Sequence, residues 1–231
     1  MSRATLPTLD SSLYPQVWEQ QTFTNPQSLL MAMLTGSISL DPKDFTKQLL
    51  ANDIYQEWIN FTVFGRYIQR SFAAFYQQSE DSFNMDIPQL FRHELMRHAQ
   101  YLPVEQTLFF AGNIPKSARR DKLFTSTINP ATAALSVQQL RQYPKKLAVT
   151  NSQELIINQI RIVGKQVVGF AIRHNKRTSE RTRNEVLILD FHDLRLVNEQ
   201  VLNREKLSNT AMPDSTTISS TAILLRSYEL R

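Results

Sequence analysis

Three consecutive hydroxyl residues and a carboxylate sixty residues later are the side chains of this chain best suited to chemistry. Thr125, Ser126 and Thr127 lie in the segment 123–135, where an apolar pair precedes them and an Asn-Pro pair, a favoured helix start, follows. Glu185 ends a polar loop and begins an apolar run. A fixed carboxylate can stabilise developing positive charge, and hydroxyls can orient it. Taken singly, the hydroxyls also suit a strand end before a helix cap, and Glu185 a solvated strand start.

A short segment directly before Glu185 carries a concentration of positive charge. It contains only one acidic residue, Glu180, among five basic ones. Such a run is typical either of a solvated loop or of a surface that contacts an acidic partner or a phosphate group. The basic residues are Arg173, Lys176, Arg177, Arg181 and Arg183.

Several common kinds of chemistry are excluded or disfavoured by residue type and spacing. His93 and His98 are five residues apart, which turns them about 140° from each other on a helix, whereas a zinc-protease helix needs a spacing of four. None of the 5 glycines forms a Walker or Rossmann phosphate loop, and no nucleophile elbow occurs. With no cysteine in the chain, thiolate catalysis and disulfides are impossible. We therefore expect no metal site.

Composition indicates an ordinary globular protein with a sizeable core. The 231 residues are 42% hydrophobic and 20% charged, with a net charge of +5. No run of 18 apolar residues occurs, and the N-terminus lacks the apolar region of a cleavable signal. We expect a protein that does not insert in membranes and is cytoplasmic in the cell that makes it. A specialised system would be needed to export it into a host cell.

The first hundred residues predict helices after an irregular start. Asn25-Pro26 and Asp41-Pro42 each combine an N-cap with a proline at the first helical position, and Gly36 is a natural stop for the first of these helices. A further helix is expected to begin at 86–88. Between them, apolar side chains recur every three or four residues, which predicts a long amphipathic helix whose stripe is core. That stripe is Ile54, Trp58, Phe61, Phe64, Ile68, Phe72 and Phe75.

After Pro103 the apolar pattern becomes that of short strands, interrupted by one helix from Pro130 to about Tyr143. Because strands follow one another directly, the sheet should be largely antiparallel and the fold class α+β. We expect an arm (1–24) with Tyr14, Val17, Trp18 and Phe23 as anchors, a helical region (25–101), and a β-rich domain (102–231) built as a β-sandwich. The expected strands are 106–111, 147–150, 154–163, 167–173, 185–191, 194–201 and 222–230.

From Leu102 to the C-terminus, these motifs resemble in order those of the ADP-ribosyltransferase toxins and effectors. The segment 102–112 looks like the first strand of that fold, and Phe124-Thr125-Ser126-Thr127 resembles its Ser-Thr-Ser strand. The alanine-rich helix start at 131–134 is similar to the helix that follows. The strand 167–173, the loop 174–184 and the run 185–189 resemble the family's strand, acceptor loop and catalytic-glutamate strand.

The resemblance implies a site for NAD, which serves as a substrate, in a cleft between sheets. Ser126 would orient the catalytic carboxylate, and Thr125 and Thr127 would shape the strand. Glu185 would bind the ribose 2′-hydroxyl and stabilise the positive sugar as nicotinamide leaves. Phe109 or Phe110 would stack on nicotinamide.

Two departures from the family pattern affect what the resemblance implies. The first strand lacks the arginine that usually holds the NAD phosphates, since Phe110 or Ala111 stands in its place. Arg119 or Arg120 could substitute for it. Members that modify arginine carry Glu or Gln two residues before the catalytic glutamate, where this chain has Arg183, so an arginine acceptor is not expected. A side-chain hydroxyl, a carboxylate, an amide or a nucleic-acid group remains open as the acceptor.

The sequence therefore predicts a monomeric mono-ADP-ribosyltransferase that uses NAD to modify a host protein. The basic segment 173–183 would dock an acidic surface of that acceptor. The alternative is a protein without catalytic activity that binds an acidic partner through the same segment. Nucleic-acid binding ranks last, because the segment lacks the interleaved aromatic residues that such a surface needs.

Overall fold

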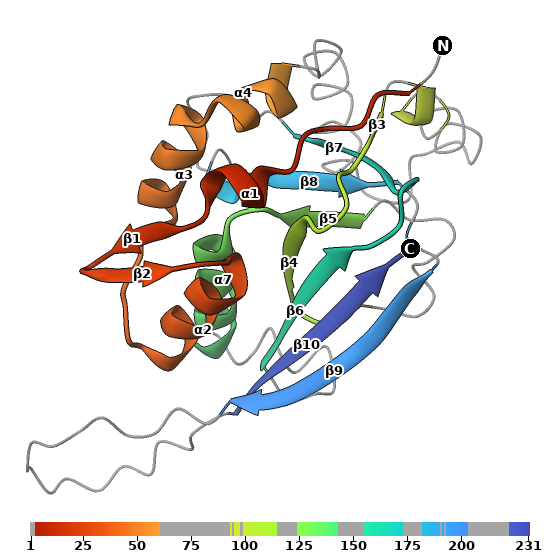
Figure 1. Cartoon of the computed structure of the whole chain (residues 1–231). Coiled ribbons are helices and arrows are strands. Elements are labelled where there is room, and N and C mark those ends of the chain that lie inside the picture. Colours follow the sequence, from red (N-terminus) through yellow and green to blue (C-terminus); the bar gives the residue numbers. More distant parts are fainter. Residues whose placement is uncertain are drawn as a thin grey trace, which may run out of the picture.

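The computed structural model describes residues 3–60, 93, 95–97, 99–114, 124–142, 155–172, 182–189, 191, 193–202 and 222–231. Helices from residues 9–60 gather beside a large mixed sheet (Figure 1). The class is α+β and the sheet is mainly antiparallel, as the succession of strands predicts.

The helices begin at the caps that the sequence predicts. Asn25 accepts a hydrogen bond from the Ser28 amide at 2.8 Å, and Gly36 ends the same helix with a left-handed φ of 82°. Asp41 caps the next helix through the Lys43 amide at 2.8 Å. The helices are α1 (Leu9–Leu13), α2 (Pro26–Thr35), α3 (Pro42–Ala51), α4 (Asp53–Asn60) and α7 (Pro130–Gln142), and residues 95–97 are also helical.

Ten strands are described, and eight of them form one sheet. The strands are β1 (Gln16–Trp18), β2 (Gln21–Phe23), β3 (Gln100–Tyr101), β4 (Thr107–Ala111), β5 (Phe124–Thr127), β6 (Leu155–Ile162), β7 (Val168–Ala171), β8 (Glu185–Ile188), β9 (Leu194–Leu202) and β10 (Ile223–Leu230). The large sheet has the order β3-β7-β8-β5-β4-β6-β10-β9, and β1 pairs with β2 separately. Every pair of named strands is antiparallel except β6–β10.

The large sheet consists of two four-stranded halves. Between them, β4 and β5 pair through one residue pair, Phe109 with Thr127, whereas the strands within each half pair over longer stretches. The halves run in different directions: β5, β7 and β8 lie across the view of Figure 1, and β6, β10 and β9 run diagonally. By their hydrogen bonds the described strands form one sheet, because β4 pairs with a strand of each half, and the β-sandwich stays a prediction.

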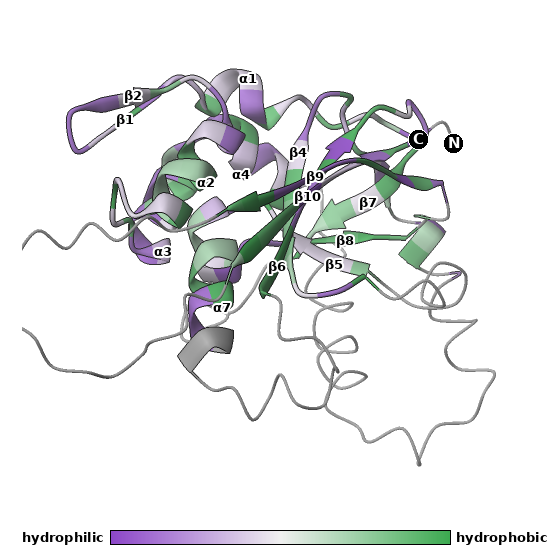
Figure 2. Cartoon of the chain, turned by 90° about the horizontal axis from the view of Figure 1, so that it is seen from below, coloured by the Kyte–Doolittle hydropathy of each residue, from purple (hydrophilic) through white to green (hydrophobic). Residues whose placement is uncertain are grey.

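The main hydrophobic cluster draws residues from all three predicted regions, including Leu9, Trp58 and Leu108. A second cluster lies over β7 and β8 and includes Leu95, Phe170 and Leu187. Hydrophobic residues colour β6 and β8, and hydrophilic ones colour much of β1 and β2, in Figure 2. Burial of the apolar strands on both faces explains why they read as nearly continuous hydrophobic runs.

The N-terminal arm is built into this core. The Leu6 amide donates to the Tyr101 carbonyl at 2.9 Å, next to the isolated bridge between Thr5 and Tyr101 of β3. The Trp58 indole donates to the Pro7 carbonyl at 2.9 Å. Of the predicted anchors, Tyr14 and Phe23 are buried and Trp18 packs against the core. Val17 is 64% exposed, so its assignment as an anchor is wrong: it lies on an outward-facing position of β1.

The remaining predicted elements are found where the structure describes them. Strands β4, β6, β7, β8, β9 and β10 lie within or close to the predicted ranges, and α7 follows the hydroxyl run. The predicted long helix is present as α4 as far as Asn60. Its continuation, the start expected at 86–88 and the strand expected at 147–150 lie outside the described residues.

Candidate functional site

The two strands that carry the candidate catalytic residues are direct neighbours. In the antiparallel pair β5–β8, Thr127 lies opposite Glu185, Ser126 opposite Val186 and Thr125 opposite Leu187. Residues directly opposite each other project from the same face, and alternate residues project from opposite faces. Glu185 therefore shares its face with Thr127 and Thr125, and Ser126 lies on the other face.

Ser126 is fixed on the face that packs against the main core. Its side chain is buried, and Oγ donates to the Val186 carbonyl at 3.1 Å. Val186 belongs to the main cluster, whereas Leu187, on the face of Glu185, belongs to the second cluster. The structure thus separates Ser126 from the Glu185 carboxylate that the resemblance expects it to orient.

The two threonines on the Glu185 face differ in what their hydroxyls do. Thr127 Oγ1 donates to the Arg183 carbonyl and accepts from the Asn129 amide at 2.9 Å, so its hydroxyl serves the fold. Thr125 Oγ1 is buried and has no hydrogen-bond partner in the described structure. Leaving a buried hydroxyl without a hydrogen bond costs free energy. Such a group therefore calls for a partner, and a bound ligand would be one.

Glu185 lies directly after a residue with an unusual backbone. Asn184 has a φ of 46°, in the left-handed region, and is 2% exposed. Its Oδ1 accepts from the Thr46 hydroxyl at 2.8 Å and from Asn129 Nδ2 at 2.9 Å, and its Nδ2 donates to the Tyr55 hydroxyl at 3.2 Å. The amide side chain thereby ties the start of β8 to helices α3 and α4 and to the α7 cap.

Asn129 joins the hydroxyl strand to the same network. Its Oδ1 accepts from the amides of Ala131 at 3.0 Å and Thr132 at 3.2 Å, which caps α7 as the sequence predicts. Its Nδ2 donates to the Pro42 carbonyl at 3.1 Å as well as to Asn184. The side chains of Asn129 and Asn184 are both buried, so the network fixes the relative position of β5 and β8.

Arg183 is the described basic residue beside the Glu185 carboxylate. Its Nη1 lies 3.7 Å from Glu185 Oε1, with the arginine side chain 56% exposed and the glutamate side chain 19% exposed. The carboxylate is thus partly accessible, and the guanidinium is the more exposed of the two charged groups. Of the predicted cofactor and acceptor residues, Arg119, Arg120, Arg173, Lys176, Arg177 and Arg181 lie outside the described residues.

The predicted aromatic residues of β4 occupy different surroundings. Phe109 is completely buried and belongs to the main cluster, so its ring serves the core. Phe110 is partly buried, and its ring centroid lies 5.1 Å from that of Phe124, which in turn contacts Phe191 at 5.1 Å. Because Phe124 lies two residues before Ser126 on β5, Phe110 packs on the Ser126 face and not on the face of Glu185.

A second buried polar cluster ties the N-terminal arm to β4. Asp10 accepts hydrogen bonds from Gln106 Nε2 at 2.6 Å and from the Thr107 amide at 2.9 Å. Burial raises the pKa of the Asp10 carboxyl to about 6 against the opposing effect of these hydrogen bonds. Burial, with the neighbouring Asp10 charge, also raises the pKa of Tyr14. This cluster fixes the entry of β4 into the sheet.

The described residues contain no group of three or more His, Asp or Glu side chains placed to hold a metal ion. Among the helices that the structure describes, none is long and apolar enough to cross a membrane. The sequence motifs do not identify Thr46, Tyr55 or Asn184 as members of the hydrogen-bond network behind Glu185. Asn184, directly before the candidate carboxylate, was the one signal that could have drawn attention to them.

Comparison with protein-family models, with curated proteins and with solved structures gives no match.

Proposed function

We propose that this protein is a mono-ADP-ribosyltransferase that transfers ADP-ribose from NAD to a protein side chain and releases nicotinamide. The observation that supports it best is the pairing of β5 with β8, with Thr127 opposite Glu185. The resemblance requires the hydroxyl strand to lie beside the carboxylate strand, although the two motifs are sixty residues apart. If β5 and β8 paired with other strands, the hydroxyl run and Glu185 would lie apart and could not form one site.

In this proposal Glu185 is the catalytic residue. Its carboxylate accepts a hydrogen bond from the 2′-hydroxyl of the nicotinamide ribose and faces the positive charge that develops on the sugar as nicotinamide departs. A carboxylate held in place stabilises such a charge without reorganisation at the moment of reaction. The network around Asn184 and Asn129 supplies that fixed position.

The register of β5 leads us to move the orienting role from Ser126 to Thr125. Thr125 shares the Glu185 face and carries the buried hydroxyl without a described partner, whereas Ser126 is bonded to a carbonyl on the other face. Thr125→Val should lower the rate of transfer, because valine keeps the shape and removes the hydroxyl. Ser126→Ala, its matched control, should affect stability more than transfer.

The phosphates of NAD would be held by an arginine outside β4. The residues of β4 are Thr-Leu-Phe-Phe-Ala, which offer no positive charge. Arg119 or Arg120, in the segment that follows this strand, would supply it. The acceptor would be a host protein whose acidic surface meets the segment 173–183, reached by specialised export from the producing cell.

The absence of an arginine from β4 favours a second candidate function, a protein that binds an acidic partner without catalysis. The two functions differ in whether NAD is consumed. The basic segment would serve the same docking role in both, so binding of a partner does not distinguish them.

The test is transfer of label from labelled NAD to a host-cell lysate, with wild type compared to Glu185→Ala. The enzyme predicts label on a discrete acceptor that is lost in the variant. If neither protein binds or consumes NAD while both remain folded, the non-catalytic function replaces it.

A further inference from the structure

The turn that carries Arg183 and Glu185 is held at four successive carbonyl groups. Each carbonyl accepts a hydrogen bond from a different group, so the backbone of the turn has little freedom. The donors are Thr132 Oγ1 at 2.6 Å to Thr182, Thr127 Oγ1 to Arg183, the Ile128 amide at 3.1 Å to Asn184, and the Ile172 amide at 2.7 Å to Glu185. The side chains of Arg183 and Glu185 are therefore attached to a backbone whose position is fixed.

The two charged side chains, Glu185 and Arg183, differ in how much of each is exposed to solvent. Glu185 is the more buried, and Arg183 lies 3.7 Å from it with more than half of its side chain exposed. A group that reacts with a sugar held by Glu185 must come within a few ångströms of that carboxylate. It therefore also comes near the Arg183 guanidinium, which lies 3.7 Å from that carboxylate.

The charge of Arg183 discriminates among the side chains that could be acceptors. At such distances the positive charge of Arg183 repels the cations of lysine and arginine, and it offsets the charge of Glu185, which would otherwise repel an anion. The guanidinium also matches a carboxylate in shape, with two parallel N–H groups facing two oxygens. Of the common acceptors, an Asp or Glu side chain fits this surrounding best.

The proton balance favours the same acceptor. A hydroxyl, amide or guanidinium must lose a proton when it forms the new bond, which requires a base in addition to Glu185. Arg183, the described partner of the Glu185 carboxylate, is not a base at neutral pH. A carboxylate is already deprotonated at pH 7 and needs none.

We propose that the acceptor of this transferase is a carboxylate of an Asp or Glu side chain and that Arg183 selects it; this inference rests on the proposed function. One carboxylate oxygen forms a bond to C1 of the nicotinamide ribose while the C1–N bond breaks. The bonding pair stays with nicotinamide, which loses its positive charge and leaves as a neutral molecule. The product is an ester, and no proton is transferred.

The linkage chemistry tests the inference directly. Protein labelled from NAD by the wild type is treated with neutral hydroxylamine, which cleaves carboxylate esters and leaves linkages to serine in place. We expect release of most of the label, and we expect poly-glutamate to be a better acceptor than poly-lysine. Label that resists hydroxylamine contradicts the acceptor class while leaving the transferase intact. A wild type that consumes no NAD contradicts the proposed function and this inference together.

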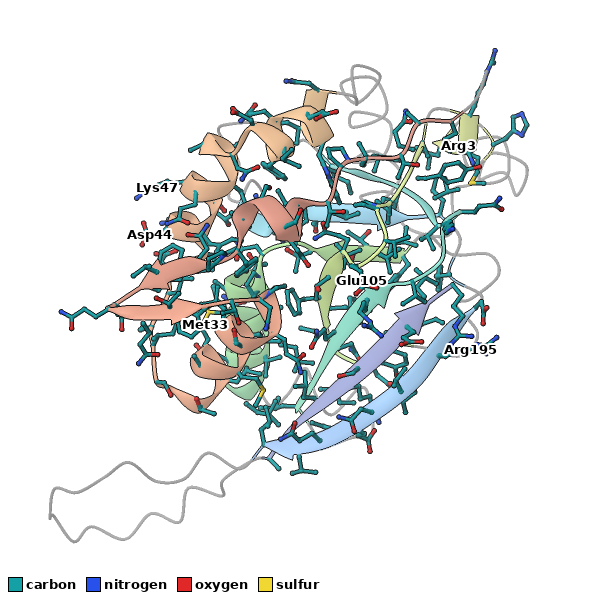
Figure 3. The ribbon with its side chains drawn as sticks, in the orientation of Figure 1. Arg3, Met33, Asp44, Lys47, Glu105 and Arg195 are labelled. Carbon is teal, nitrogen blue, oxygen red and sulfur yellow. The ribbon has the colours of Figure 1, made fainter. Side chains whose placement is uncertain are left out.

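The role of Arg183 is tested with Arg183→Glu and a matched control, Arg195→Glu. Arg195 is 58% exposed and bonded to an acid two residues away, Asp193, as Arg183 is to Glu185, but it lies on the outer strand β9 (Figure 3). We expect Arg183→Glu to lower transfer to poly-glutamate about tenfold, the scale of reversing one partly exposed charge. Hydrolysis of NAD by water, a neutral acceptor, is measured in the same variant as the reference, because the substitution also acts on Glu185, and transfer should fall severalfold more than hydrolysis. Equal loss of transfer in both variants, or equal loss of transfer and hydrolysis in Arg183→Glu, would overturn the selective role.

Discussion

At the scale of single residues, Asn184 carries two duties that can be separated by substitution. Asn184→Ala removes the bonds to Thr46, Asn129 and Tyr55 and also places a Cβ in the left-handed region at φ 46°. Asn184→Gly removes the same bonds without the backbone strain. We expect the glycine variant to lose about 2 kcal/mol of unfolding free energy and the alanine variant about 1 kcal/mol more. Urea denaturation measures both, and equal losses would show that the backbone is not strained.

Asp10 should make stability depend on pH. Its folded pKa of about 6 exceeds the ordinary 3.8, so the folded state holds the proton more tightly. Ionisation of Asp10 therefore lowers the free energy of unfolding. This loss is absent below pH 3.8, grows between pH 3.8 and pH 6, and is complete above pH 6. It amounts to at most about 3 kcal/mol.

Denaturant midpoints of wild type and Asp10→Asn between pH 4.5 and 7.5 provide the measurement. The advantage of wild type over Asp10→Asn should shrink as pH rises, whereas Asp44→Asn, at an exposed carboxylate on α3, should track wild type (Figure 3). A constant difference across this range would show that Asp10 keeps an ordinary pKa.

Part of the candidate site could be predicted from the sequence at this scale. Residue types and order identify Glu185 and the hydroxyl run, and the Asn-Pro pair identifies the α7 cap. The face on which each hydroxyl lies depends on strand register, and three similar side chains in a row contain no alternation from which to read it. The network joins Thr46 to Asn184 across 138 residues, and no local pattern specifies such a contact.

At the scale of elements, Gly169 is the position where β7 tolerates no side chain. A Cβ there would lie 2.5 Å from the Leu187 carbonyl oxygen on β8 and 3.0 Å from a side-chain carbon of Leu102. Since the carbonyl belongs to the neighbouring strand, it cannot move without disturbing the β7–β8 ladder. We expect Gly169→Ala to destabilise the protein by about 2–3 kcal/mol in urea denaturation. A loss below about 0.5 kcal/mol would mean that β7 and β8 can separate locally without cost.

Elements with strong local signals were predictable, and elements defined by tertiary pairing were not. The caps and prolines of α2 and α3 place both helices within a residue or so, and the apolar runs place β6 to β10. The short strands β1, β2 and β3 have polar or mixed sequences whose strand geometry comes from their partners. The parallel pairing of β10 with β6 likewise depends on a distant segment.

At the scale of the whole molecule, the N-terminal arm is part of the core. Leu9 is completely buried in the main cluster, whereas Val17 on β1 is 64% exposed. Leu9→Ala should cost about 2–5 kcal/mol through lost burial and a residual cavity. Val17→Ala, its control, should stay within about 0.5 kcal/mol. Similar small effects at both positions would show that the arm is dispensable for folding.

The central claim is that the carboxylate at the start of β8 performs catalysis, and release of nicotinamide from NAD tests it most directly. Wild type, Glu185→Gln and Glu57→Gln, an exposed glutamate on α4, would be compared at saturating NAD. We expect Glu185→Gln to lower kcat about 100-fold or more with little change in KM, because the carboxylate acts on charge that exists only in the transition state. Glu57→Gln should match wild type. Release that is equally fast in all three proteins, or absent from folded wild type, would contradict the claim.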